Sequence, residues 1–224
     1  MTTFEYTTSV HPVREDVVAA QRAVWERIAR AGHWWTGEQR VAIAEQARAA
    51  RVQRAVAPWL RDFPDLDVAL PEAALKTARM IAADAPKIER EWAAAQISEL
   101  GDAAYVELAA VVNCVCAIDT YADALGVAYE PLPDPVAGEP DRVRNADVMD
   151  VGAYVPLQHP WQGPNVGRAL SLAPEQNMMF MTLVMAMYGG PHSFFELVWE
   201  GGALSRPQVE LLAARVSAVN ECFY

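Results

Sequence analysis

The chain has 224 residues, 53% of them hydrophobic, which is enough for one large domain or two small ones with a sizeable core. Eighteen Lys and Arg residues are set against 29 Asp and Glu, so the formal net charge is -11. With no basic block along the chain, this balance argues against binding to nucleic acid or to an anionic membrane.

The sequence also predicts a cytoplasmic location. The first twelve residues lack the basic start and apolar stretch of a secretory signal. The longest uncharged apolar run, residues 178–188, is shorter than the roughly 20 residues of a membrane span. Three cysteines do not make a disulfide framework, so a reducing compartment is expected.

The first half of the chain predicts a succession of helices. Apolar residues recur at close to helical spacing over residues 13–31. Thr36, with Gln39 three positions later, forms a capping-box pattern that begins a helix reaching to about residue 56. Three further helices are expected, over residues 71–84, 86–97 and 102–125.

The third of these is long and apolar, with Asp102 as its expected cap and Gly126 as its stop. It is followed by a segment of another kind, since residues 128–167 contain seven prolines with glycines between them. Such a long irregular stretch is uncommon unless it is functional or links two units. We expect a connector over the surface, with a short ordered patch at residues 154–157.

Helical signals resume at about Pro174. Five methionines cluster in the next segment, and they predict either core packing or the lining of a substrate channel: Met178, Met179, Met181, Met185 and Met187. Ser205 and Gln208 form a second capping-box pattern, with Pro207 in the first turn of the last helix. No strand pattern of any length is present, so the predicted class is all-α.

Two segments of the chain are similar to each other. The stretches that begin at Leu100 and Leu204 each continue with a capping residue, then Val-Glu-Leu, then an Ala/Val-rich helix. When Glu107 is aligned with Glu210, Asp119 falls opposite Cys222. We therefore predict a duplication in which Glu107 and Asp119 mark a degenerate pseudo-site.

The duplication suggests an N-terminal helical unit over residues 1–127 and a C-terminal unit over residues 168–224. Residues 128–167 would connect them, in one compact domain overall.

The last fifteen residues carry the chemistry. Glu210 is followed twelve positions later by Cys222, within an apolar helical segment. This resembles the active-site segment of the alkylhydroperoxidase D-like proteins of the carboxymuconolactone decarboxylase superfamily, whose pattern is Glu, twelve residues to a Cys, C-x-x-C, and a His four positions on. Residues 34–44 also resemble the lead-in helix of that superfamily. The resemblance implies an all-α bundle of the alkylhydroperoxidase D-like type, built from two related helical units.

The resemblance also implies a function: a thiol- or selenol-dependent peroxidase that reduces hydroperoxides. In the family, the second Cys reduces the peroxide and the first Cys resolves the resulting sulfenic acid, while Glu and His relay the proton. Cys222 corresponds to the resolving thiol and Glu210 to the relay acid. The peroxidatic residue and the His would be the first and fifth residues after Tyr224, so a chain ending at Tyr224 would lack an efficient cycle.

Three explanations for this end are open. The polypeptide stops before its natural end, the gene is truncated, or the next codon is UGA, which encodes selenocysteine at one motif position in some relatives. The expected partners are a hydroperoxide, a thiol reductant or reductase protein, and further copies of the chain, with no cofactor. The alternative function is a non-catalytic helical scaffold for oligomerisation, and a lactone decarboxylase-type lyase is a more distant one.

Reactivity at Cys222 needs a particular local geometry. In one continuous helix, Glu210 and Cys222 would lie about 18 Å apart, far beyond proton-transfer reach. We therefore expect the chain to turn near residues 217–220, or a partner subunit to supply one of the two groups. Asn220 is a good N-cap, and it would place Cys222 in the first turn of a new helix. The opposing interpretation is that Cys222 is only a small residue near a frayed end and that Glu210 is a first-turn carboxylate.

The other cysteines and the histidines give weaker indications of function. Cys114 and Cys116 are two positions apart on a predicted helix, so they face different sides and are expected to be buried and inert. The four histidines have no metal-ligand spacing, and we expect no metal site. His33, beside Trp34 and Trp35, is interpreted as part of a packed helix junction.

Overall fold

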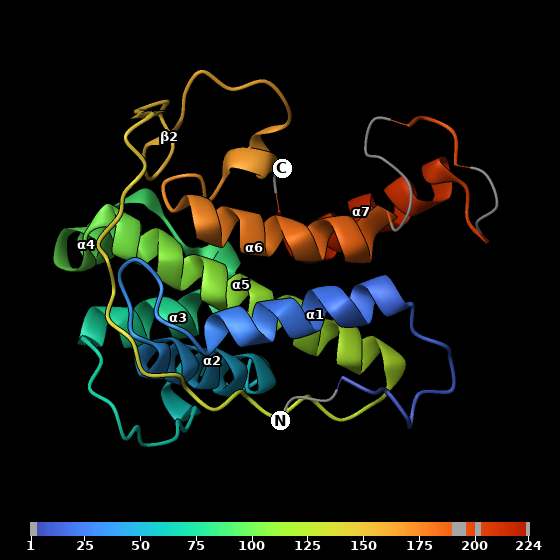
Figure 1. Cartoon of the computed structure of the whole chain (residues 1–224), viewed down its shortest axis with the longest axis horizontal. Coiled ribbons are helices and arrows are strands. Elements are labelled where there is room, and N and C mark those ends of the chain that lie inside the picture. Colours follow the sequence, from blue (N-terminus) through green and yellow to red (C-terminus); the bar gives the residue numbers. More distant parts are fainter. Residues whose placement is uncertain (1–3, 190–195, 200–202, 223–224) are drawn as a thin grey trace.

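The computed structural model describes residues 4–189, 196–199 and 203–222 (Figure 1). These residues confirm the all-α class, because their only strands are the two-residue β1 (Val148–Met149) and β2 (Leu157–Gln158). The α-helices, in chain order, are α1 (Glu15–Ile28), α2 (Gly37–Val52), α3 (Glu72–Asp84), α4 (Arg90–Leu100), α5 (Asp102–Leu125), α6 (Pro174–Val184) and α7 (Arg206–Val219). Short 3₁₀ turns lie between them: η1 (Pro58–Leu60), η2 (Ala85–Lys87) and η3 (Asn165–Arg168).

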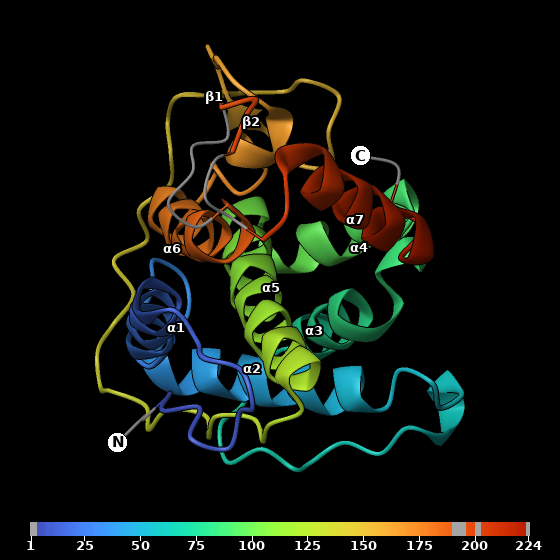
Figure 2. The ribbon, with the colours of Figure 1, turned by 90° about the vertical axis from the view of Figure 1, so that its right-hand side faces the viewer.

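Helix α5 is the axis of the bundle. Most of its side chains are buried, and it packs against α2, α3, α4 and α6 (Figure 2). In the described part of the chain it is the one helix long and apolar enough to cross a membrane, and most of it lies inside the protein. Its continuous apolar character is that of a core helix surrounded by other helices on several sides.

Several of the expected helix ends are found, but the helix expected over residues 86–97 begins only at Arg90, after the 3₁₀ turn η2, and extends to Leu100. Thr36 caps α2, with the backbone N–H of Gln39 donating to Thr36 Oγ1 at 3.2 Å and the Thr36 N–H donating to Gln39 Oε1 at 3.1 Å. Gly126 ends α5 in the left-handed conformation, at φ 66°, which glycine adopts without strain. The expected cap Asp102 is instead the first residue of α5, because Gly101 occupies the N-cap position.

The proline-rich segment 128–167 runs along the outside of the bundle, as expected, and is attached to it by specific hydrogen bonds. The Val136 N–H donates to the Ala29 carbonyl at 2.8 Å, and Trp25 Nε1 donates to the Pro131 carbonyl at 2.8 Å. The ordered patch extends beyond the expected residues 154–157, because it is the antiparallel ladder of β1 and β2.

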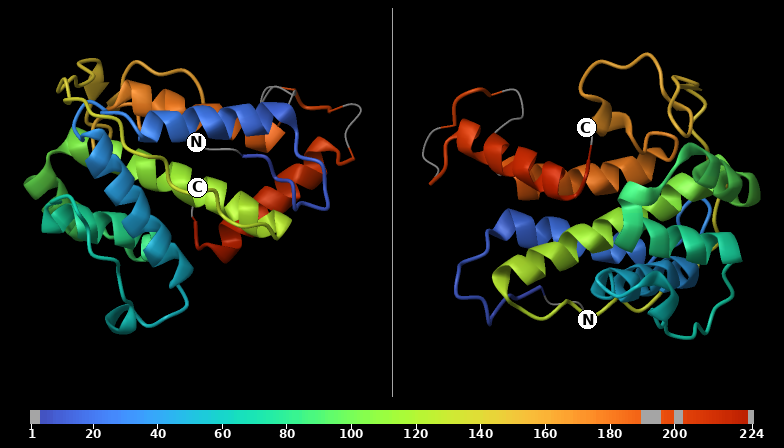
Figure 3. Two further views of the ribbon diagram at one scale, coloured as in Figure 1. Left: turned by 60° about the horizontal axis from the view of Figure 1, so that its bottom comes forward. Right: turned by 180° about the vertical axis from the view of Figure 1, so that it is seen from behind.

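The C-terminal part of the chain divides between the core and the surface. Helix α6 packs against α1 and α5 and continues into η4 (Met185–Gly189), a π-helical turn. Helix α7 contributes no buried residue and lies on the outside of the bundle (Figure 3). The second predicted unit therefore shares the core of the first through α6, while α7 stays outside it.

The methionine cluster is divided between the core and the surface. Met179 is buried in the core, whereas Met178 is 70% exposed and Met185 is 43% exposed. Core packing therefore explains Met179 alone of these three. The exposed pair lines a surface groove between α1 and α6, described below.

Candidate functional site

The predicted site at the end of the chain starts with a helix end. Helix α7 stops at Val219, Asn220 is its C-cap, and Glu221 takes a positive φ of 53°. The Cys222 N–H reaches back to the Ser217 carbonyl at 2.9 Å, which closes the last turn in the manner of a Schellman motif. The exposed sulfur lies just past the helix. Because α7 runs unbroken to Val219, the chain turns only after that residue, and the turn expected near residues 217–220 to bring Cys222 back to Glu210 is not formed.

Asn220, however, ends α7, and nothing in the described residues makes it the cap of a new helix. The expectation that Cys222 sits in the first turn of a following helix falls on residues 223–224, which lie outside the described residues. The carbonyl groups of α7, rather than free N–H groups, point toward this end of the helix.

Glu210 is held near the start of α7. Its Oε2 accepts from the Tyr188 hydroxyl at 2.9 Å, and its Oε1 accepts from Arg206 Nε at 2.9 Å. Burial of Tyr188, together with this hydrogen bond, raises the pKa of the Tyr188 phenol. Because α7 is continuous from Glu210 to Val219, nine helical steps separate Glu210 from the end of the helix, about 13.5 Å along the axis. A single chain therefore does not bring the two groups together.

The other two thiols lie on α5 inside the bundle. Burial raises the pKa of Cys114 to about 12, and that of Cys116 to about 12 as well. Both are thiols at neutral pH. Cys114 is buried as expected, whereas Cys116 is only partly buried. Of the three cysteines in the chain, Cys222 alone is exposed.

The pseudo-site glutamate occupies the most buried polar cluster described. Glu107 is completely buried on α5 and accepts three hydrogen bonds. The backbone N–H groups of His33 and Trp34 donate to its Oε2 at 3.0 and 2.9 Å. Arg40 Nη1 donates to its Oε1 at 2.7 Å. The carboxylate thus fixes the α1–α2 junction and balances the charge of a buried arginine.

Arg40 continues the cluster toward α6. Its guanidinium donates to Gln176 Oε1 at 3.3 and 3.4 Å, and its Nη2 lies 3.8 Å from the sulfur of Met179. Burial lowers the pKa of Arg40, and the charge of Glu107 opposes this. Arg40 Nε and Gln176 Nε2 are buried without a hydrogen-bond partner among the described residues.

The cluster presses closely on the backbone. A Cβ atom built on Gly32 would lie 1.8 Å from Glu107 Oε1 and 2.2 Å from Arg40 Nη1. Both side chains are fully buried and hydrogen-bonded, so neither has space to withdraw. Glycine at position 32 is therefore what allows the carboxylate to reach the α1–α2 junction.

The second pseudo-site residue also pairs with α2. Asp119 is 1% exposed and accepts two hydrogen bonds from Arg48, at 2.8 and 2.7 Å. One turn on, Arg51 pairs with Asp123. Glu107 and Asp119 thus pair with arginines of α2 and join α2 to α5. The alignment of the two similar segments of the chain did not suggest this role. A signal was available, because Arg40 lies on the same face of its helix as Ile43, Ala44 and Ala47.

His33 lies in a packed helix junction, as expected. Its ring is buried, and Nδ1 lies 2.6 Å from Asp141 Oδ1 on the connector. Its Nε2 is 3.8 Å from Glu175, which pairs with Arg27. Within the described ranges, no group of three or more His, Cys, Asp or Glu residues is arranged to hold a metal ion.

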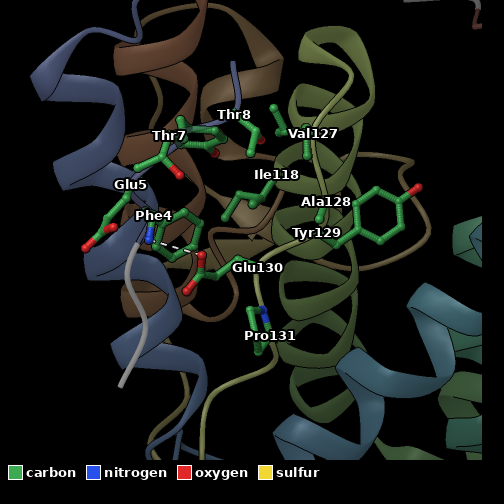
Figure 4. A pocket seen from close by; sticks show the side chains of 12 residues that line it. Phe4, Glu5, Thr7, Thr8, Ile118, Val127, Ala128, Tyr129, Glu130 and Pro131 are labelled. Carbon is green, nitrogen blue, oxygen red and sulfur yellow. Dashed lines mark hydrogen bonds between the residues drawn. The ribbon is translucent and has the colours of Figure 1, made fainter.

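A separate hollow of about 270 Å³ lies between residues 4–8 and residues 127–131 (Figure 4). The Phe4 N–H donates to Glu130 Oε2 at 3.0 Å across its floor, and Figure 4 shows these two groups facing each other. The lining contains no cysteine, histidine or arginine. The hollow is therefore a seam between the N-terminal segment and the connector, remote from the thiol chemistry predicted for α7.

Comparison with family models, curated proteins and solved structures gave no match to this chain. A functional argument therefore depends on the residues themselves and on the geometry described above.

Proposed function

We propose that this chain is the scaffold of a thiol- or selenol-dependent peroxidase with an alkylhydroperoxidase D-like fold. The observation that carries the proposal is the position of Cys222. It is the exposed thiol of the chain, it lies just beyond the C-terminal end of α7, and it has the Glu-x₁₁-Cys spacing of the resemblance. Glu210, the relay acid of the resemblance, lies on the same helix and is already hydrogen-bonded to a hydroxyl.

The reaction would proceed in two steps. A peroxidatic thiolate or selenolate takes one oxygen from the hydroperoxide, releases the alcohol and becomes a sulfenic or selenenic acid. Cys222 then attacks that group, forms a disulfide or selenylsulfide and releases water. A thiol reductant or a reductase protein returns both groups to the reduced state. Because continuous helix separates Glu210 from the end of α7 by about 13.5 Å, proton relay between Glu210 and Cys222 would require a partner subunit.

The first prediction concerns the thiols. We expect one thiol per native chain to react rapidly with a disulfide reagent and all three to react after unfolding, because Cys114 is buried and Cys116 is only partly exposed. Cys222→Ser should remove the rapid phase, and Cys116→Ser should leave it unchanged. A rapid phase that survives Cys222→Ser would show that another thiol is the accessible one and would argue against the peroxidase proposal.

The second prediction concerns activity, and it is tested on the protein extended by the five codons that follow Tyr224. We expect hydroperoxide-dependent oxidation of a thiol reductant. Glu210→Gln should lower the rate by about 10²- to 10⁴-fold, the usual contribution of acid–base catalysis. In Cys222→Ser the peroxidatic residue should still be oxidised once, but it should form no disulfide or selenylsulfide. Mass spectrometry measures both products. If those codons encode no Cys or selenocysteine followed by His, the motif assignment is wrong.

A second candidate function, the non-catalytic oligomerisation scaffold, is favoured by a separate observation. Helix α7 exposes an apolar face made of Leu211, Leu212, Val216 and Val219, each at least 56% exposed. Apolar side chains that gather on one exposed helix face usually mark an interaction surface. The same face would also assemble the subunits of a peroxidase.

The third prediction tests this face. Leu212→Glu combined with Val216→Glu should convert an oligomer into a monomer, because the charges would be buried against the partner. The free energy of unfolding of the bundle should change by less than about 0.5 kcal/mol, since both positions are exposed. Ala214→Glu, at an exposed position on another side of the same helix, is the control for added charge. Equal molar masses for the parent and the double variant by light scattering would exclude the scaffold function for α7.

A further inference from the structure

The surface between α1 and α6 contains an apolar groove that the proposed chemistry does not use. One hollow of about 730 Å³ is lined by alanines of α1 and methionines of α6, and an adjoining hollow of about 500 Å³ shares Ala23, Met178 and Thr182 with it. The side chains that form the walls are mainly Ala19, Ala20, Ala23, Met178, Met181 and Met185. Figure 1 shows the two helices side by side along their lengths. Flexible methionine walls adapt to apolar molecules of varied shape.

One end of this groove reaches the buried polar cluster. Met179 lines the smaller hollow, and its sulfur lies 3.8 Å from Arg40 Nη2. Arg40 and its partner Gln176 do not line the hollow themselves, but each has a buried nitrogen with no hydrogen-bond partner among the described residues, Arg40 Nε and Gln176 Nε2. A buried donor without an acceptor is costly and points to a missing oxygen or nitrogen acceptor.

The charges around the Met179 end of the groove indicate whether the missing acceptor is anionic or uncharged. Arg40 is paired with Glu107, and Arg27 with Glu175, so the two cations next to the smaller hollow already have counter-charges. At the other end of the groove Asp16 is paired with Arg14. An anionic head group would therefore enter a site whose charges are balanced and would leave a buried charge uncompensated. An uncharged acceptor satisfies the donors without that cost.

We propose that the groove between α1 and α6 binds an uncharged aliphatic molecule with a carbonyl oxygen at one end. The alkyl chain lies along the alanine and methionine walls. The carbonyl oxygen reaches the Arg40 and Gln176 donors when the Met179 side chain rotates aside, and methionine has the three rotatable bonds that this movement needs. Ketones, aldehydes and esters share this chemistry.

The test uses the full chain with ¹³C-labelled methionine methyl groups and three probes of equal length: 2-decanone, n-decane and decanoate. We expect saturable shifts of Met178, Met179, Met181 and Met185, with Met80 and Met149 on other elements as internal controls. Each hydrogen bond formed predicts that the ketone binds about two- to twelvefold more tightly than the alkane. Decanoate should bind more weakly than the ketone.

Two variants separate the parts of the proposal. Ala23→Phe fills the groove from an exposed position, so it should abolish binding of every probe while leaving the bundle intact. Ala94→Phe, at an exposed position of α4, is the matched control. Gln176→Glu keeps the oxygen that accepts from Arg40 but removes a donor, so the preference for ketone over alkane should fall while alkane binding persists.

Three outcomes would overturn the proposal. Shifts that do not saturate, or that survive Ala23→Phe, would show that the groove is not a binding site. Equal affinities for ketone and alkane would show that the buried donors are not used. Tighter binding of decanoate would show that the head group is anionic. Should Gln176→Glu not fold, the comparison of the three probes and the Ala23→Phe variant still decide the matter.

Discussion

Glu107→Gln is expected to lower the free energy of unfolding by about 3–5 kcal/mol, the usual effect of removing one member of a fully buried ion pair. Glutamine keeps the size of the side chain but leaves the Arg40 guanidinium in the core with no counter-charge. Urea unfolding followed by tryptophan fluorescence measures the change. Glu72→Gln, which removes an exposed pair with Lys76, is the control and should cost less than about 1 kcal/mol.

Replacing Arg40 as well as Glu107 separates the effect of the buried charge from the effect of side-chain shape. In Arg40→Met/Glu107→Gln no net charge is buried, and the glutamine oxygen still accepts from the backbone N–H groups of His33 and Trp34. The double variant should therefore be more stable than Glu107→Gln alone. A stability of Glu107→Gln within about 1 kcal/mol of the parent would show that Arg40 is not held by this carboxylate.

Gly32→Ala is the second substitution for which we expect a large effect. The added methyl group would overlap Glu107 Oε1 and Arg40 Nη1, so either the ion pair breaks or the α1–α2 junction moves. Overpacking of this kind usually costs about 1–3 kcal/mol, and loss of the ion pair would add to it. Calorimetric unfolding measures the combined loss.

The effect of Gly32→Ala should shrink where Glu107 has already been replaced by alanine, because the main obstacle is then absent. Gly138→Ala is the matched control, since its added Cβ would meet Ala31 at an ordinary 3.5 Å. Equal losses for the two glycine substitutions would mean that close approach of the carboxylate is not the reason for glycine at position 32.

The positions of the helices were predictable because they depend on local signals. The Thr36–Gln39 capping box and the left-handed Gly126 act within a few residues of chain, and both were found where expected. The axial role of α5 also follows from its composition, since a helix that is apolar on most sides must be surrounded.

The polar cluster was not predictable in the same way. Glu107 and its partner Arg40 are 67 positions apart, and Gln176 is a further 69 positions along the chain, so no local pattern joins them. Glu107 was singled out for its resemblance to Glu210, yet the structure gives the two glutamates different surroundings. One is completely buried, whereas the other is exposed and bonded to Tyr188. Similar spacing along two helices did not require similar burial, because burial depends on what packs against each helix.

Helix α7 contributes no side chain to the buried core, and this affects how its sequence can evolve. Substitutions on that helix are free of the packing constraints that act on α5, so thermodynamic stability and surface chemistry can vary separately. Selection acting on the terminal cysteine and its neighbours would therefore leave the melting temperature of the remaining helices almost unaffected.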